Sequence, residues 1–302
     1  MNDIQVRARA ELRKRQIIEE EGIETQYQIF SKTYAHDPAQ FVTDCIKFPK
    51  GEQADPYQLN ILNELVENKR VCVRSPHGAG KSCMMSWATL WFSLTRDAMN
   101  GDWKIPTLAS TWRQLIKFLW PEIHKWSYRV NWDVVGRRPF NADELLARSI
   151  QLDHGEAFAI ASSTPEFIEG VHADNVMYVF DESKIIPDSI WDSAEGAFST
   201  GDALWFACST PGEQKGRFWQ IQSEAPGYED WKTRQITLEE FLETGRVNQE
   251  WVDSRKRQWG ESSVIYQNRV LGNFAADDTM GVVPLSWVER AVERWHSWQD
   301  DG

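Results

Sequence analysis

Apolar residues recur along this chain at two different spacings, which alternate from residue 37 to residue 212. Apolar positions three and four residues apart predict helices, and they occur at 37–48, 57–69, 81–96 and 111–126. Short runs rich in β-branched and aromatic residues predict strands, and they occur at 69–75, 105–110, 175–183 and 203–212. Residues 149–163 predict a further pair of short strands. Strands that alternate with helices predict an α/β fold with a mostly parallel central sheet flanked by helices.

The chain changes character towards both of its ends. Residues 3–24 predict a charged, mostly exposed helix, and from about residue 226 the sequence is richer in charge. That last part predicts helices around EEFLE, EWVDSRKRQWGE and LSWVERAVERW. We therefore predict a helical N-terminal extension over 1–50, a core over 51–225 and a helical region over 226–302.

Composition narrows the class of protein only in part. Of the 302 residues, 41% are hydrophobic and 26% are charged, which is typical of a soluble globular protein. The net charge of -12 argues against a generally basic nucleic-acid coat, although a local basic groove stays compatible with it. No apolar run reaches the length of a membrane span, and the N-terminus is too charged for a signal peptide. The four cysteines form no CxxC pair, so we expect buried, reduced thiols in an intracellular protein.

The stretch RSPHGAGKS, residues 74–82, connects a predicted strand to a predicted helix, which is the setting of a phosphate-binding loop. Gly78 and Gly80 allow the backbone to approach phosphates closely. Lys81 is placed to reach the β- and γ-phosphates, and Ser82 to ligate Mg²⁺ at the start of the helix. Ser75 stands where the usual pattern has glycine, so a chance match is the alternative. The candidate nucleotide-binding residues are Ser75, Pro76, His77, Gly78, Ala79, Gly80, Lys81 and Ser82.

A second predicted strand carries two carboxylates at its end. The apolar run Val176–Phe180 is followed by Asp181 and Glu182, at the end of the strand where ligands gather in parallel sheets. Asp181 can hold Mg²⁺ through water, and Glu182 can orient and activate an attacking water. The alternative is a pair of exposed strand-end carboxylates with no chemical role. The two motifs together predict an ATP site.

Two further positions fit such a site. In CSTPG, residues 208–212, the hydroxyls of Ser209 and Thr210 follow another predicted strand and could sense a γ-phosphate, although an ordinary turn is the alternative. The amide of Gln58, in DPYQLNIL, could read the edge of adenine, although it could also lie on a solvated helix face.

The order of these motifs resembles the large terminase subunit of tailed bacteriophages and prophages. The resemblance covers roughly residues 40–295, from DPYQLNIL and RSPHGAGKS through TLASTWRQ and FIEGVHADNVMYVFDES to SIWDSAEGAF, ACSTPGEQKGRFW and RVLGNF…VVPLSWVERA. It implies a P-loop NTPase domain of the additional-strand, RecA-like class that uses ATP and Mg²⁺ to drive double-stranded DNA into a procapsid.

The resemblance also implies roles and partners. Lys81, Asp181 and Glu182 match the two Walker motifs, with Glu182 as the catalytic carboxylate, and Ser209 and Thr210 match the motif that couples hydrolysis to motion. Gln58 matches the adenine-reading glutamine, and residues 111–114 match a segment facing DNA or nucleotide. The implied partners are a portal and procapsid, a small terminase subunit and further copies of the chain in a ring, a pentamer in this family. The implied location is the cytoplasm of a bacterial host.

The sequence departs from the family pattern in two ways. His77 stands where many terminases place an arginine in the phosphate loop; it could stabilise transition-state charge only when protonated. Arg74 is one candidate substitute, and Arg113, Arg137 or Arg138 could act within the chain or on a neighbour. Terminases also usually carry a nuclease domain after this point, which needs clustered carboxylates on a separate sheet. We therefore expect the chain to correspond to the ATPase half, without nuclease activity.

Other classes of protein share parts of this pattern. A helicase-like nucleic-acid ATPase would need a second RecA-like lobe, and residues 213–302 predict too little sheet for one. A nucleotide or metabolite kinase would need an acceptor pocket and lid, for which no motif is present. A non-hydrolysing P-loop scaffold, with His77 and Ser75 as signs of a decayed site, is the third alternative.

Overall fold

Residues 24–109, 111–161, 168–199, 202–275 and 295 are described by the structure, a computed structural model of the chain. Within them, eight strands form one sheet in the order β3-β4-β5-β2-β6-β7-β1-β8. The strands are β1 (Arg70–Arg74), β2 (Trp103–Ala109), β3 (Leu145–Leu146), β4 (Ser149–Gln151), β5 (Gly155–Ala161), β6 (Asn175–Asp181), β7 (Asp202–Ser209) and β8 (Lys232–Gln235). All neighbours from β5 to β8 pair in parallel, whereas β4 is antiparallel to both β3 and β5. The predicted α/β fold with a mostly parallel sheet is confirmed.

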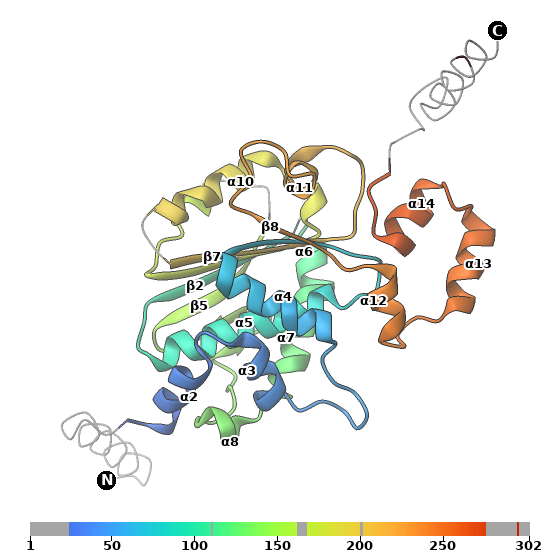
Figure 1. The fold of residues 1–302 in the computed structure, drawn as a ribbon. Coiled ribbons are helices and arrows are strands. Elements are labelled where there is room, and N and C mark those ends of the chain that lie inside the picture. The colour runs from blue at the N-terminus through green and yellow to red at the C-terminus, as the bar shows by residue number, and fades with distance from the viewer. Residues whose placement is uncertain (1–23, 110, 162–167, 200–201, 276–294, 296–302) are drawn as a thin grey trace, which may run out of the picture.

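Helices cover both faces of this sheet (Figure 1). On one side lie α2 (Gln26–Tyr34), α3 (Pro38–Cys45), α4 (Pro56–Asn68), α5 (Lys81–Ala98), α7 (Trp120–Ser127) and α8 (Trp132–Val135). On the other side lie α10 (Asp188–Glu195) and α11 (Gly216–Gln222). The short helices α12 (Leu238–Glu243), α13 (Gln249–Trp259) and α14 (Val264–Tyr266) gather beside one end of the sheet. Residues of α12, α13, α14 and their connections form a small apolar cluster of their own around Val252, Tyr266 and Val270.

Alternation along the central strands builds the two faces of the core. In β6, Met177 and Val179 belong to the cluster under α4 and α5, whereas Tyr178 and Phe180 belong to the cluster under α10 and α11. Successive side chains of a strand point to opposite faces, so a strand buried on both sides is apolar at nearly every position. This explains why the predicted strands read as continuous apolar runs.

The helix predicted over 111–126 is present, but it contains a wide turn. It consists of α6 (Trp112–Gln114), the π-helical turn η1 (Leu115–Leu119) and α7. Pro121 lies in the first turn of α7, and proline has no N–H to donate to the carbonyl four residues earlier. We attribute the π-turn to this missing donor, since such turns arise where the regular ladder is interrupted.

The sheet extends beyond the boundary that we placed at residue 225. Strand β8 pairs in parallel with β1 through Lys232–Gln235 and forms one edge of the sheet. Its residues are polar, so this short edge strand has no apolar run that would predict it from the sequence. Helices α2 and α3, placed in a separate extension by the sequence, also contribute Phe30, Tyr34 and Phe41 to the main core.

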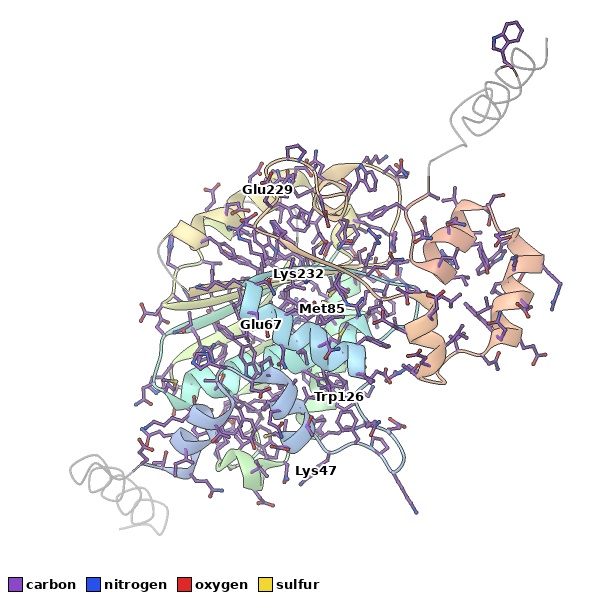
Figure 2. All side chains as sticks on the ribbon, in the orientation of Figure 1. Lys47, Glu67, Met85, Trp126, Glu229 and Lys232 are labelled. Carbon is purple, nitrogen blue, oxygen red and sulfur yellow. The ribbon has the colours of Figure 1, made fainter. Side chains whose placement is uncertain are left out.

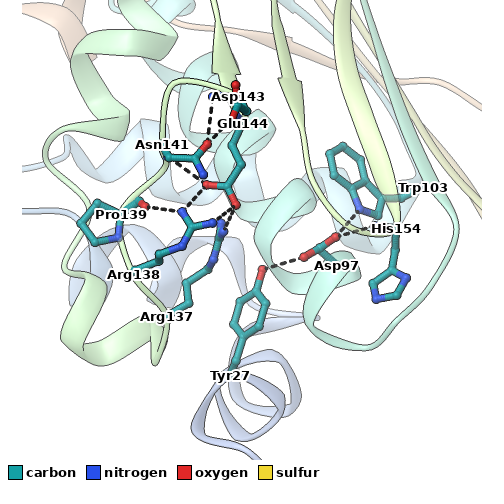
Figure 3. Close-up of polar contacts among 10 residues, drawn as sticks. All are labelled: Tyr27, Asp97, Trp103, Arg137, Arg138, Pro139, Asn141, Asp143, Glu144 and His154. Atoms are coloured by element: carbon teal, nitrogen blue, oxygen red, sulfur yellow. Dashed lines mark hydrogen bonds and ion pairs between the residues drawn. The ribbon is translucent and has the colours of Figure 1, made fainter. Parts of the chain in front are cut away.

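The buried carboxylate of Asp97 connects α2 to the segment between β4 and β5 (Figure 3). Asp97 Oδ2 accepts a hydrogen bond from Tyr27 Oη at 3.3 Å, and its Oδ1 accepts one from the backbone N of His154 at 3.0 Å. Trp103 Nε1 approaches the same Oδ1 at 3.5 Å. Burial raises the pKa of Asp97, although the hydrogen bonds from His154 and Trp103 oppose the shift. The network therefore joins the N-terminal helix, the end of α5 and the β4–β5 connection.

Two of the predicted helices fall in the terminal parts of the chain. The helices predicted at 3–24 and 285–295 lie outside the described residues except for Glu24 and Trp295. Among the helices that are described, none combines the length and apolar character needed to cross a membrane.

Candidate nucleotide site

Three neighbouring strands end at one place on the carboxyl edge of the sheet. Strand β7 lies between β1 and β6, with Arg74 opposite Ser209 and Asp181 opposite Cys208. The phosphate loop after β1, the two carboxylates after β6 and the hydroxyl pair after β7 therefore lie side by side. The structure brings together three motifs that lie between residues 75 and 210 of the sequence.

The loop from Ser75 to Ser82 uses its glycines where the backbone requires them. Gly78 and Gly80 have φ values of 86° and 80°, in the left-handed region that glycine adopts at little cost. Gly80 immediately precedes α5, so the loop leads straight into the N-terminus of a long helix. Unpaired N–H groups and the helix dipole make such a terminus favourable for an anion.

Lys81 is almost completely buried, and its ammonium contacts both sides of the site. Nζ donates to Ser75 Oγ and Thr210 Oγ1, each at 3.0 Å, and approaches the Pro76 carbonyl at 3.3 Å. Burial lowers the pKa of Lys81, and the charges of Glu182 and Asp181 oppose that shift. Among the residues that the structure describes, Lys81 Nζ has neutral oxygens and no carboxylate at hydrogen-bond distance, and a buried cation in such surroundings is a strong anion site.

Ser75 is compatible with the loop although glycine is usual there. Its φ is not positive, so the position does not require glycine's conformational freedom. Its hydroxyl donates to the Pro76 carbonyl at 2.9 Å and accepts from Lys81. The serine thus contributes a ligand for Lys81 that glycine would lack.

Asp181 and Glu182 lie on the cavity side of the strand end, in different environments. Asp181 is 5% exposed, and burial, together with the charge of Glu182, raises its pKa to about 7. Glu182 has a left-handed φ of 50° and accepts a hydrogen bond from Ser209 Oγ at 3.3 Å. Such strain in a non-glycine residue is typical of functional positions. Ser209 thus contacts Glu182, while Thr210 contacts Lys81.

Gln58 lies under the phosphate loop, and its side chain is fully buried. Its Oε1 accepts from the backbone N of Asp55 at 2.9 Å, and Nε2 has no partner among the described residues. A Cβ on Gly80 would lie 2.3 Å from this Nε2. Tyr57, its neighbour on α4, donates its hydroxyl to the Ala79 carbonyl at 3.1 Å. In this structure the first turn of α4 supports the loop, and the role of Gln58 in reading adenine stays a prediction.

Arg74 does not point into the site, contrary to the expectation that it could replace a catalytic arginine. Nη1 donates to Gln222 Oε1 at 3.1 Å, and Nη2 to Gln235 Oε1 at 2.7 Å. Its neighbour two residues earlier, Cys72, belongs to the core under α10 and α11. Side chains two apart on a strand share a face, so Arg74 lies on the face of the sheet opposite to α5.

The other candidate cations differ in position. His77 is exposed at the cavity, and partial burial and the charge of Lys81 lower its pKa. Its neutral form therefore predominates at neutral pH. Arg137 and Arg138 both form ion pairs with Glu144, each at 2.7 Å (Figure 3). These pairs lie within one short segment of the chain, which is far from the phosphate loop in the sequence. Arg113 is exposed.

A cavity of about 490 Å³ opens over Lys81, Ser82, Asp181 and Glu182. It continues along α5 and α7 past residues that the sequence had not singled out: Phe48, Glu52, Gln53, Cys83, Trp87, Phe118, Glu122, Lys125, Trp126, Arg129 and Arg246. Trp126, labelled below α4 in Figure 2, is one of these lining residues. Trp126 packs edge-on against Trp87 at 5.0 Å and in a tilted arrangement against Phe48 at 5.4 Å, both measured between ring centroids. The i, i+4 spacing of Gln114, Phe118, Glu122 and Trp126 was the signal that could have placed them on one helix face.

Arg246 reaches the cavity from the connection between α12 and α13. Its Nε lies 2.6 Å from Asp55 Oδ2, in the residue that precedes α4. No sequence pattern relates these two residues, which are far apart along the chain.

Comparison with solved structures gives matches to large terminases of bacteriophages. The large terminase of a thermophilic bacteriophage matches with a TM-score of 0.56 and 14% identity, over 74% of this chain and 54% of that chain. The ATPase domain of the Thermus phage P74-26 large terminase matches with a TM-score of 0.52 and 17% identity, over 74% of this chain and 95% of that domain. The HK97 bacteriophage large terminase matches with a TM-score of 0.52 and 14% identity, over 86% of this chain and 52% of that chain.

These matches establish the fold. The chain has the fold of large terminase ATPase domains, as its motifs predicted, and it spans about half the length of the first and third of these matched proteins. The first of them, from the thermophilic bacteriophage, has been solved in complex with ADP and with ATP-γ-S. No protein-family model matches the sequence, and comparison with curated proteins gives no match.

Proposed function

We propose that this chain binds and hydrolyses ATP as the motor domain of a large terminase, and that hydrolysis moves double-stranded DNA into a procapsid. The observation that carries the proposal is the buried Lys81 ammonium, held between the phosphate loop and Thr210 beside Asp181 and Glu182. The fold shared with large terminase ATPase domains supports the same function.

The phosphates would lie along the loop and the first turn of α5. Backbone N–H groups from Gly78 to Ser82 would surround them, and Lys81 would exchange its neutral oxygen partners for the β- and γ-phosphates. Mg²⁺ fits the oxygens of Ser82 and Asp181, since this ion prefers one or two protein oxygens together with phosphates. When bound, it would neutralise charge on the phosphates. Burial raises the pKa of Asp181 even though the charge of Lys81 opposes the shift, which supports a further cation at this position.

Hydrolysis needs a base for the attacking water. Glu182 would orient this water and accept its proton as the water oxygen bonds to the γ-phosphorus and the bond to the β,γ-bridging oxygen breaks. Ser209 contacts Glu182 at 3.3 Å, and Thr210 contacts Lys81 at 3.0 Å. Loss of the γ-phosphate would therefore change contacts at both hydroxyls, which supports a coupling role for this pair.

The nucleoside would occupy the end of the cavity that α5 and α7 line. Phe48, Cys83 and Trp126 line this end, and aromatic and apolar surfaces there suit a purine ring. Arg246 lies at the same cavity and is held by Asp55. This arrangement supports nucleotide binding in which the base contacts side chains and the phosphates contact mainly backbone.

The further partners follow from the same proposal. We propose a ring of copies around DNA, a pentamer as expected for terminases, which docks on a portal and receives DNA from a small terminase subunit in the bacterial cytoplasm. In this ring a neighbouring copy would supply the catalytic arginine; Arg74 does not supply it within the chain, because its guanidinium is bound to Gln222 and Gln235 on the other face of the sheet. DNA contacts would be mainly to phosphates and therefore sensitive to salt.

A packaging assay tests the motor function. DNA uptake into a procapsid should require this chain and should stop when Lys81 is replaced by alanine. Exchange of the exposed Lys69, at the other end of β1, for alanine is the matched control. DNA uptake that continued with Lys81→Ala would show that the loop does not power DNA movement.

A further inference from the structure

Residues C-terminal to the sheet contact the phosphate loop at three successive points. Phe241 of α12 lies beside Gly78, since a Cβ on that glycine would be 3.8 Å from Phe241 Cζ. The backbone N of His77 donates to the carbonyl of Arg269 at 3.0 Å. Gly272 follows the π-helical turn η4 (Gln267–Leu271) and lies against Ser75 and Pro76. The first half of the loop therefore rests on the C-terminal helical region.

The contact at Gly272 is specific to glycine for two reasons. Its φ is +67°, which L side chains rarely adopt. A Cβ at this position would lie 2.9 Å from Pro76 Cδ, 3.0 Å from Pro76 N and 3.1 Å from Ser75 C. Two of these three atoms are backbone and the third is in a closed ring, so none can rotate away. Any side chain at residue 272 must displace either the loop or η4.

A hydrogen-bond network holds this segment in place. Nε2 of Gln235, at the end of β8, donates to Asn273 Oδ1 at 2.9 Å and approaches the carbonyls of Leu271 at 3.3 Å and Gly272 at 3.4 Å. Oε1 of the same glutamine accepts from Arg74 Nη2 at 2.7 Å. Arg74 directly precedes the phosphate loop, so Gln235 connects the start of this loop to residues 271–273. This gives Arg74 a positioning function instead of the catalytic one expected from the sequence.

We propose that residues 269–273 form a strap that sets the position of the phosphate loop, with Gly272 as its positioning residue. ATP affinity then depends on where the C-terminal helical region lies, because a displaced strap moves Ser75–His77 and with them the donors that face the phosphates. This inference rests on the proposed function, since it concerns the same nucleotide site. Movement of that region during a catalytic cycle would reach the loop through Gly272 and the Arg269 carbonyl.

The test compares Gly272→Ala with Gly260→Ala. Gly260 ends α13 in the same region and has a φ of +80°, but a Cβ there would meet nothing within 4 Å. Both variants place alanine at a positive φ, and Gly260, with a ψ of 142° against 25° at Gly272, is the more strained position of the two. An effect on ATP binding confined to Gly272→Ala therefore comes from the contact with the loop. We expect the Kd for Mg·ATP, measured by calorimetry, to rise at least tenfold in Gly272→Ala and to change less than twofold in Gly260→Ala. The rise in Tm on adding ATP should be smaller in the first variant and unchanged in the second, which a general loss of stability would not produce.

The outcomes separate this inference from the function on which it rests. If the unaltered chain binds Mg·ATP and Lys81→Ala does not, the nucleotide site is established independently of the strap. Gly272→Ala with the affinity of Gly260→Ala would then overturn the inference alone. If Gly272→Ala does not fold, Gln235→Ala, which removes the three donor contacts to residues 271–273, should raise the Kd at least threefold. An unchanged Kd in Gln235→Ala would also overturn it.

Discussion

Asp181 provides a stability test of the site that needs no nucleotide. Its carboxyl is buried beside Glu182, Lys81 and the Cys208 thiol, and it accepts a hydrogen bond from the backbone N of Glu182 at 2.9 Å. Burial and the charge of Glu182 raise its pKa from 3.8 to about 7, against the opposing effect of Lys81. The ionised carboxylate therefore destabilises the metal-free folded chain.

The size and the sign of this effect follow from proton linkage. Because the pKa is higher in the folded state than in the unfolded state, folding takes up a proton between pH 4 and pH 7, and stability falls as pH rises through that window. A difference of about three pKa units corresponds to a cost of about 4 kcal/mol at pH 8. At pH 5 the cost of ionising Asp181 corresponds to only about one pKa unit, or about 1.4 kcal/mol. Asp181→Asn removes the charge with little change of shape, so its advantage over the unaltered chain should grow by about 3 kcal/mol from pH 5 to pH 8.

Urea unfolding in EDTA at pH 5, 6, 7 and 8 measures this difference. Asp133→Asn, on the exposed side of α8, is the matched control and should show no such growth. A stability difference between Asp181→Asn and the unaltered chain that stays constant from pH 5 to pH 8 would refute the reasoning. The same variant should also lose the Mg²⁺ dependence of ATP binding, since Asn is a weaker ligand for this ion.

Two further substitutions probe the supports of the core and of the loop. Asp97→Ala should lower the free energy of unfolding, measured by chemical unfolding, by about 2–4 kcal/mol, because it leaves the donors of Tyr27 and His154 without an acceptor. The control is the ATP affinity of the folded variant, which should be unchanged. Gly80→Ala should weaken ATP binding at least tenfold, since its Cβ would lie 2.3 Å from Gln58 Nε2 and its φ is +80°. In a Gln58→Ala background the same Gly80 substitution should weaken ATP binding less than in the unaltered chain, and an equal loss in both backgrounds would show that the contact with Gln58 is not the cause.

The central strands and their terminal motifs could be predicted because both signals are local. Val176–Phe180 is apolar at every position because β6 is buried on both faces, and its carboxylates necessarily follow at the carboxyl edge. The order of the strands could not be read in this way. Strand β7 lies between β1 and β6 and so brings Ser209 to Glu182. This order depends on contacts between segments that are far apart in the sequence.

The position of Arg74 was within reach of the sequence and was missed. Val71 and Val73 belong to the core under α5, and Cys72 to the opposite one, so alternation places Arg74 with Cys72. Gln58 and Gly272 are different, because nothing local indicates that one lies under Gly80 and the other against Pro76. Strand β8 escaped notice because an edge strand needs few apolar residues.

Phosphate release from Mg·ATP by the unaltered chain and by Glu182→Gln tests the central claim most directly. Glu182→Gln keeps the shape of the side chain but cannot accept the proton of the attacking water. The account predicts ATP turnover by the unaltered chain in the presence of DNA, and at least a hundredfold slower turnover by the variant at an equal Kd for ATP. Equal turnover by the two proteins, or none by the unaltered chain at saturating ATP, would contradict it.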